Sequence, residues 1–260
     1  CSSDLEKNVE LKIDNMPLKL FNKKLISYYL KNYKFIKLTG NKVIDRLEEI
    51  RIFKEKLSSI EIYEIGTDFI MLKDLSDPKR LDIQNLIEKI VDIVKILFEQ
   101  ILEEGKTTFI GQIDSNINKL TFLTYKTINY NLDKQIKIEE IKNTIYYWRI
   151  VTALETIGDI LKRVSRYISR DKETNKSKLK EMVKELMEYY TFIVGLINSD
   201  VNIDNNLKLY LDKKQSILRE FEEAKSQAGS EANMYLVVTQ LLKDIIGRLD
   251  VITLSVIDIH

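Results

Sequence analysis

Hydrophobic and polar residues alternate over short stretches in the first eighty residues. Residues 9–13 (Val-Glu-Leu-Lys-Ile) alternate strictly, which predicts a half-buried strand. Asn15-Met16-Pro17 follows with turn chemistry, so residues 18–21 are predicted to be the return strand of a β-hairpin. The remaining pattern predicts helices around 25–30 and over 43–57, and strands over 35–38, 60–65 and 68–72. This region is therefore predicted to be a small α+β domain.

After Pro78 the pattern changes to helical periodicity. The predicted helices are long and their connections are short, which favours antiparallel neighbours in a bundle. Only 8 Gly and 2 Pro occur in 260 residues, which argues against a loop-rich β fold. The predicted fold class is therefore mainly α: six helices, preceded by the α+β region. Those helices span 83–104, 107–131, 138–170, 174–198, 203–227 and 231–258.

The six helices divide into two similar halves. The third helix contains Glu155 and Gly158-Asp159, and the sixth contains Asp244 and Gly247-Arg248 at matching spacing. The second and fifth helices each carry an acidic residue, Asp114 and Asp212. We therefore predict two three-helix repeats, with domains at 1–80, 81–172 and 173–260.

Composition excludes several kinds of chemistry. There is one Cys, at position 1, and one His, at position 260, so an internal disulfide, a Cys-based zinc site and a Ser-His triad are excluded. Any metal would have to be held by carboxylates. The net charge of +1 does not itself indicate nucleic acid. No run of 18 uncharged apolar residues occurs, so no membrane insertion is expected.

Four oxygen-bearing side chains form the strongest candidate site. Glu155 and Asp159 are four residues apart on one helix face, and Asp114 and Asn118 have the same spacing on a neighbouring helix. Carboxylate and amide oxygens suit a hard or borderline cation. The alternative is that the acids face solvent, paired with Lys119, Lys162 or Arg163.

The second half differs at the matching positions. Arg248 follows Asp244 by four residues and is expected near Asp212. An arginine there would pair with both acids and repel a divalent ion. We therefore predict an ion pair of Asp212, Asp244 and Arg248 in place of a metal.

The segment from Ala153 to Val164 (ALETIGDILKRV) resembles the acidic motif helix of PhoU proteins, which are phosphate-uptake regulators built from two three-helix repeats. Residues 113–123 are similar to the acidic helix that precedes it in that family. The resemblance implies iron or zinc at Asp114, Asn118, Glu155 and Asp159. Asn118, Ser216 and Arg248 depart from the family pattern, which favours a single ion or no metal over a full cluster.

The N-terminal region resembles the archaeal AbrB–PhoU group. Residues 29–36, 60–64 and 68–78 are similar to the domain that precedes the PhoU repeats, and residues 4–11 with 18–21 are similar to part of an AbrB swapped hairpin. That hairpin implies dimerisation and DNA binding. Residues 1–40 hold eight lysines and four acids, a local charge of +4 that a solvated surface explains equally well. The candidate DNA contacts are Lys7, Lys12, Lys19, Lys23 and Lys24.

The expected function is therefore regulation of phosphate uptake by a non-enzymatic, cytoplasmic homodimer. Its expected partners are a phosphate transporter or sensor protein, with DNA as a partner of the N-terminal unit. One alternative is a carboxylate-metal enzyme in the helical bundle. Another is a helical lipoprotein anchored through Cys1.

Overall fold

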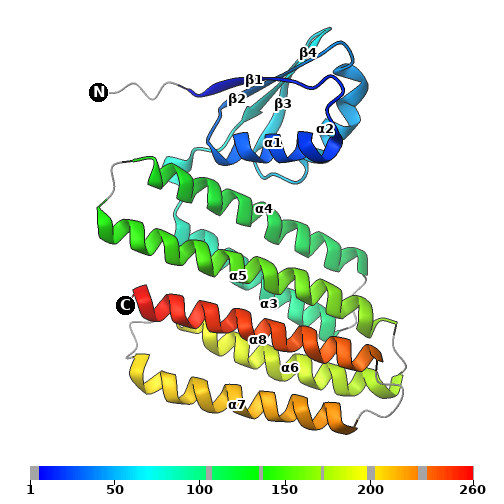
Figure 1. Cartoon of the computed structure of the whole chain (residues 1–260), viewed down its shortest axis with the longest axis vertical. Helices are drawn as coiled ribbons and strands as arrows, with labels where there is room; N and C mark the ends of the chain where they lie inside the picture. Colours follow the sequence, from blue (N-terminus) through cyan, green and yellow to red (C-terminus); the bar gives the residue numbers. More distant parts are fainter. Residues whose placement is uncertain are drawn as a thin grey trace. The chain divides into compact units, whose positions relative to one another are not determined.

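The structure is a computed structural model that describes residues 6–103, 107–134, 137–170, 173–197, 203–227 and 233–259 (Figure 1). It is mainly α-helical, with a small N-terminal sheet, as the hydrophobic pattern predicts. The chain forms two compact units. Unit 1 comprises Cys1–Leu86 and Asn118–Ile141, and unit 2 comprises Ile87–Ile117 and Lys142–His260.

Unit 1 contains a four-stranded sheet with the strand order β1-β2-β4-β3. Strand β1 (Asn8–Lys12) pairs in parallel with β2 (Phe35–Thr39), and β4 (Phe69–Asp74) pairs antiparallel with both β2 and β3 (Ile60–Ile65). Helix α1 (Leu18–Leu30) connects the two parallel strands, and α2 (Leu47–Lys54) lies between β2 and β3 in sequence. Short 3₁₀ helices occupy Ile44–Arg46 and Pro78–Arg80.

The predicted hairpin is wrong, because residues 18–21 form the first turn of α1 rather than a return strand. Pro17 occupies the N-cap position, and Phe21, Leu25 and Tyr29 follow at intervals of four and are fully buried. That spacing places three large side chains on one helix face. Leu18 and Leu20, which suggested a strand, are exposed. Strand β1 therefore pairs with β2, and no AbrB-like hairpin forms among the described residues.

One face of the sheet packs against both helices. The core combines strand residues such as Leu38 and Leu72 with Phe21 and Tyr29 of α1 and Phe53 of α2. Phe122, from the middle of helix α4, packs against the same core. Unit 1 is therefore completed by a segment that lies far along the chain.

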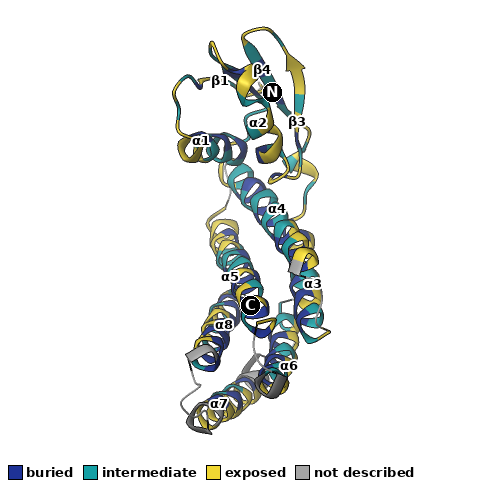
Figure 2. Cartoon of the chain, turned by 90° about the vertical axis from the view of Figure 1, so that its right-hand side faces the viewer, coloured by how far each residue is buried: buried dark blue, intermediate teal, exposed yellow. Residues whose placement is uncertain are grey.

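The long helices begin and end close to their predicted bounds. They are α3 (Ile83–Leu102), α4 (Thr107–Leu132), α5 (Ile138–Ile168), α6 (Glu173–Gly195), α7 (Ile203–Gln227) and α8 (Asn233–Ile259). Buried and exposed positions alternate along them (Figure 2), as expected for amphipathic helices. In unit 2, α6, α7 and α8 contact one another in all three pairings.

The two units differ from the predicted domains. The prediction placed a boundary at residue 80 and kept 107–131 within one repeat, whereas the C-terminal half of α4 belongs to unit 1. Periodicity could identify the helix but not which partner each half packs against. Among the described residues, no helix combines the length and apolar character that a membrane crossing requires.

Candidate functional site

Helices α4 and α5 supply the acidic residues of the predicted site. Asp114 is buried on α4, whereas Glu155 is partly buried and Asp159 exposed on α5. Gly158 is buried on the same stretch of α5. A Cβ added there would lie 2.9 Å from Cδ1 of Ile117 on α4, so glycine allows the two helices to approach closely.

The three carboxylates are close enough to influence one another. Burial raises the pKa of Glu155, and the charges of Asp159 and Asp114 raise it further. Burial also raises the pKa of Asp159, with Asp114 as the next contributor, while Lys162 and Arg163 oppose the change. The structure therefore brings together Asp114, Glu155 and Asp159, which we name the acidic cluster.

A lysine supplies positive charge to this cluster. Lys162, one turn after Asp159 on α5, donates a hydrogen bond to Oδ2 of Asp114 and forms an ion pair with it. Among the described residues, no group of three or more His, Cys, Asp or Glu side chains is arranged to hold a metal ion. As arranged, the donors do not fit the iron or zinc that the family resemblance implies, because the Lys162 ammonium group engages the buried carboxylate.

Asn118 lies one turn after Asp114 on α4 and forms no hydrogen bond with the three acids among the described residues. The ion pair predicted for the second half does not form there either. In the second half, Asp244 accepts a hydrogen bond from Gln240, and no ion pair within the described part of the chain joins Arg248 to Asp212 or Asp244. Asp250, two residues after Arg248 on α8, does form an ion pair, with Lys214. It accepts hydrogen bonds from Tyr210 and, at 2.6 Å, from Lys214.

The five lysines proposed for DNA contact do not share one element. Lys7 precedes β1 and pairs with Asp133 at 3.1 Å, and Lys12 ends β1 and lies 3.8 Å from Asp14. Lys19, Lys23 and Lys24 lie on α1. Because the hairpin that would have presented them is absent from the described residues, this part of the expectation loses its structural basis.

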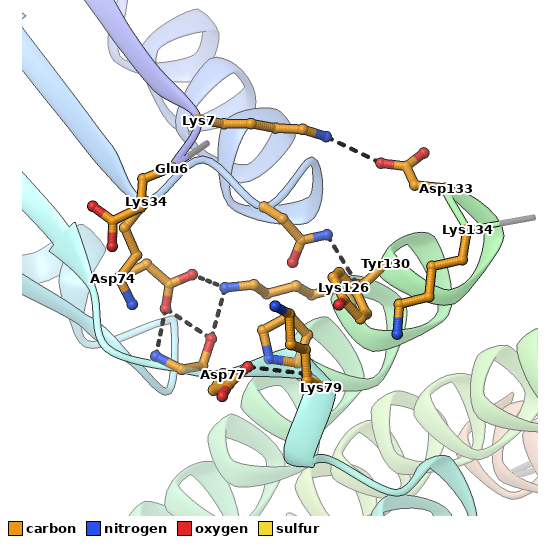
Figure 3. A pocket seen from close by; sticks show the side chains of 13 residues that line it. Glu6, Lys7, Lys34, Asp74, Asp77, Lys79, Lys126, Tyr130, Asp133 and Lys134 are labelled. Carbon is orange, nitrogen blue, oxygen red and sulfur yellow. Dashed lines mark hydrogen bonds and ion pairs between the residues drawn. The ribbon is translucent and has the colours of Figure 1, made fainter. Parts of the chain in front are cut away.

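A buried ion pair in unit 1 was missed by sequence reasoning. Lys126 of α4 and Asp74 at the end of β4 form this pair with side chains 1% and 2% exposed (Figure 3). Oδ1 of Asp74 accepts hydrogen bonds from Ser59 Oγ at 2.7 Å and from the Ser76 amide at 2.9 Å. Lys126 Nζ also donates to Ser76 Oγ at 2.6 Å.

The groups around Lys126 determine how far its buried positive charge is stabilised. Its Nζ lies 4.6 Å from the centre of the Tyr29 ring, within range of a cation–π interaction. Burial, followed by repulsion from Lys34, lowers the pKa of Lys126 to about 7. The Asp74 carboxylate opposes that change because it favours the charged ammonium. No apolar periodicity marks residue 126, so the sequence pattern carried no signal for this pair.

The same region of unit 1 contains a cavity of about 780 Å³. Five lysines line it: Lys7, Lys34, Lys79, Lys126 and Lys134 (Figure 3). We call it the lysine cavity. Its acidic lining residues are Glu6, Asp74, Asp77 and Asp133.

Comparison with known protein families, with curated proteins and with solved structures found no match to this chain.

Proposed function

We propose that this protein is a PhoU-like, non-enzymatic regulator of phosphate uptake that acts by contact with a transporter or sensor protein. In this proposal α3–α5 and α6–α8 are the two three-helix repeats. The proposal is supported by the helix order and by the motif Ala153–Val164 on α5. It does not extend to DNA, because residues 18–21 are helical.

The acidic cluster is the observation that carries the proposal. The motif helices α4 and α5 approach at Gly158 and place Asp114, Glu155 and Asp159 near one another. Asp114 is buried and neutralised by Lys162, whereas Asp159 is exposed. An exposed carboxylate beside a partly buried ion pair is available to a basic group on a partner protein. We therefore assign partner contact to Asp159 and support of α4–α5 packing to the buried part of the cluster.

Deletion of the gene tests the function directly. In cells grown with abundant phosphate, we expect the deletion to raise the uptake of radiolabelled phosphate, because a regulator that restrains the transporter is lost. The intact gene should restore the lower rate. Uptake that is unchanged by the deletion at both abundant and limiting phosphate would contradict the proposal.

A matched pair of variants tests the assignment of Asp159. Asp159→Ala should fail to restore normal uptake, whereas Glu139→Ala, which removes another exposed carboxylate from α5, should restore it. Equal protein levels of the two variants must be verified by immunoblot. Turnover of a phosphate ester by the purified protein, with or without added metal, would contradict the non-enzymatic part of the proposal.

A further inference from the structure

The lysine cavity has an excess of positive charge. Five lysines face four acids, and one of those acids, Asp77, is paired at 3.3 Å with Arg80, which lies outside the lining. Asp74 is engaged by Lys126, and Asp133 by Lys7. Three of the four acids are thus paired with a cation, Glu6 being the fourth, and additional lysines remain.

Lys34 and Lys134 are two of those additional lysines. Neither forms an ion pair with a carboxylate in the described part of the chain. The Lys134 ammonium lies 4.3 Å from the centre of the Tyr130 ring, which holds it at the cavity without neutralising it. The charge of Lys34 acts on Lys126, which shows that the two amines are near enough to repel each other. An anion between such amines would relieve this repulsion.

Several residues that line the cavity are held in place by hydrogen bonds. Asp74, Ser76 and Lys126 are fixed by mutual hydrogen bonds, and the backbone carbonyl of Lys34 accepts a hydrogen bond from the Asp74 amide at 2.9 Å. Asn32, which also lines the cavity, donates a side-chain hydrogen bond to the backbone carbonyl of Lys126 on α4 at 3.4 Å. A site fixed in this way loses little conformational entropy when a ligand binds.

We propose that the lysine cavity binds a small phosphate-bearing molecule, whose phosphate oxygens contact Lys34 and Lys134. Lysine ammonium groups are well suited to phosphate as point charges. The volume of about 780 Å³ exceeds the need of a single phosphate ion and falls in the range of ligand pockets. A pyrophosphate or nucleotide therefore fits the cavity better than inorganic phosphate. This inference is independent of the function proposed above.

Titration calorimetry of the full chain at about 50 mM salt tests the proposal, because low salt preserves electrostatic contacts. The probes are inorganic phosphate, pyrophosphate, ATP and, as an anion without phosphorus, citrate. We expect pyrophosphate or ATP to bind, and to bind at least about tenfold more tightly than citrate. If inorganic phosphate binds as tightly as pyrophosphate and ATP, the site is assigned to the free phosphate ion. Absence of binding by all three phosphate compounds, or equal binding of citrate, would overturn the proposal.

Lysine-to-glutamine variants locate the site. Lys34→Gln and Lys134→Gln, singly and together, should weaken binding, with a loss of at least about tenfold in the double variant. Lys23→Gln is the matched control, because Lys23 is exposed on α1 and does not line the cavity. Circular dichroism establishes that each variant is folded. Unchanged affinity in the folded double variant, or an equal loss in Lys23→Gln, would overturn the assignment.

Discussion

At the scale of single residues, Glu155 shows how neighbours change the energetics of a carboxyl group. It lies on α5 beside Asp159 and near Asp114, and burial together with these charges raises its pKa above the ordinary value of 4.5. In the interval between 4.5 and the raised pKa, the folded state binds more protons than the unfolded state. The free energy of unfolding therefore falls as pH rises through that interval, and the cost persists at neutral pH.

Glu155→Gln should accordingly stabilise the protein at pH 7. The gain should be below about 1 kcal/mol, because Glu155 is partly exposed and solvent screens the repulsion. The gain should shrink as the pH falls below 4.5, where the wild-type carboxyl is protonated in both states. Urea denaturation at pH 7 and pH 4 measures the difference.

Glu139→Gln provides the control for this prediction. Glu139 is exposed in the first turn of the same helix, where a negative charge interacts favourably with the helix dipole. Its replacement should therefore not stabilise the protein. A Glu155→Gln variant that is less stable than wild type at pH 7, or that differs from wild type by the same free energy at pH 7 and pH 4, would show that the clustered charges are not the dominant effect.

At the scale of elements, the two motif glycines have different surroundings. A Cβ at Gly158 of α5 would lie 2.9 Å from Cδ1 of Ile117, whereas a Cβ at Gly247 of α8 would have no neighbour within 4 Å. The sequence places both glycines at matching positions of the proposed repeat. Only the first marks a close approach of two helices.

Alanine substitution should change the free energy of unfolding differently at the two glycines. Gly247→Ala should raise the free energy of unfolding by about 0.5–1 kcal/mol, because alanine has the higher helix propensity and meets open space. Gly158→Ala should lack that gain, because Ile117 must shift. Urea denaturation of the two variants provides the comparison.

Ile117→Val removes the methyl group that the new Cβ would meet. In that background Gly158→Ala should become more favourable than in the wild-type background, a coupling that a double-mutant cycle measures. Additive effects of the two substitutions would contradict the proposed contact between α4 and α5.

At the scale of the whole molecule, unit 1 is built from two segments that are distant in sequence. The C-terminal half of α4 contributes Phe122 to the core of the sheet domain and Lys126 to the buried pair with Asp74. Asn129 adds a hydrogen bond to the carbonyl of Leu30 at 3.2 Å. The N-terminal region is therefore incomplete without residues 118–141.

A fragment of residues 1–86 should be unstable by itself. It would lose Phe122 from its core and the Lys126 cation that pairs with Asp74, and it would expose the apolar surface that α4 covers. A peptide of residues 118–141 added in trans should restore cooperative unfolding, followed by circular dichroism in urea. The same peptide with Lys126→Met should restore much less. Cooperative unfolding of the fragment with the same midpoint in the presence and absence of peptide would refute this prediction.

The sequence predicted the elements more successfully than their partners. Helices such as α3 were predictable because buried residues recur every three or four positions, from Ile83 through Ile90 to Ile101. The exception was the start of α1, where Leu18-Lys19-Leu20 alternates like a strand although the buried stripe runs through Phe21, Leu25 and Tyr29. A period of two over four residues is too short to distinguish the two structures.

The sequence alone determined that the chain is mainly helical, where each long helix lies, and that Asp114, Glu155 and Asp159 are candidate site residues. These are local properties, because periodicity and spacing act within one element. Tertiary structure decided the pairing of Lys162 with Asp114, the burial of Lys126 against Asp74 and the attachment of residues 118–141 to unit 1. These contacts depend on which elements pack together. A lysine in a sequence gives no sign of whether its side chain will be solvated or buried against a carboxylate.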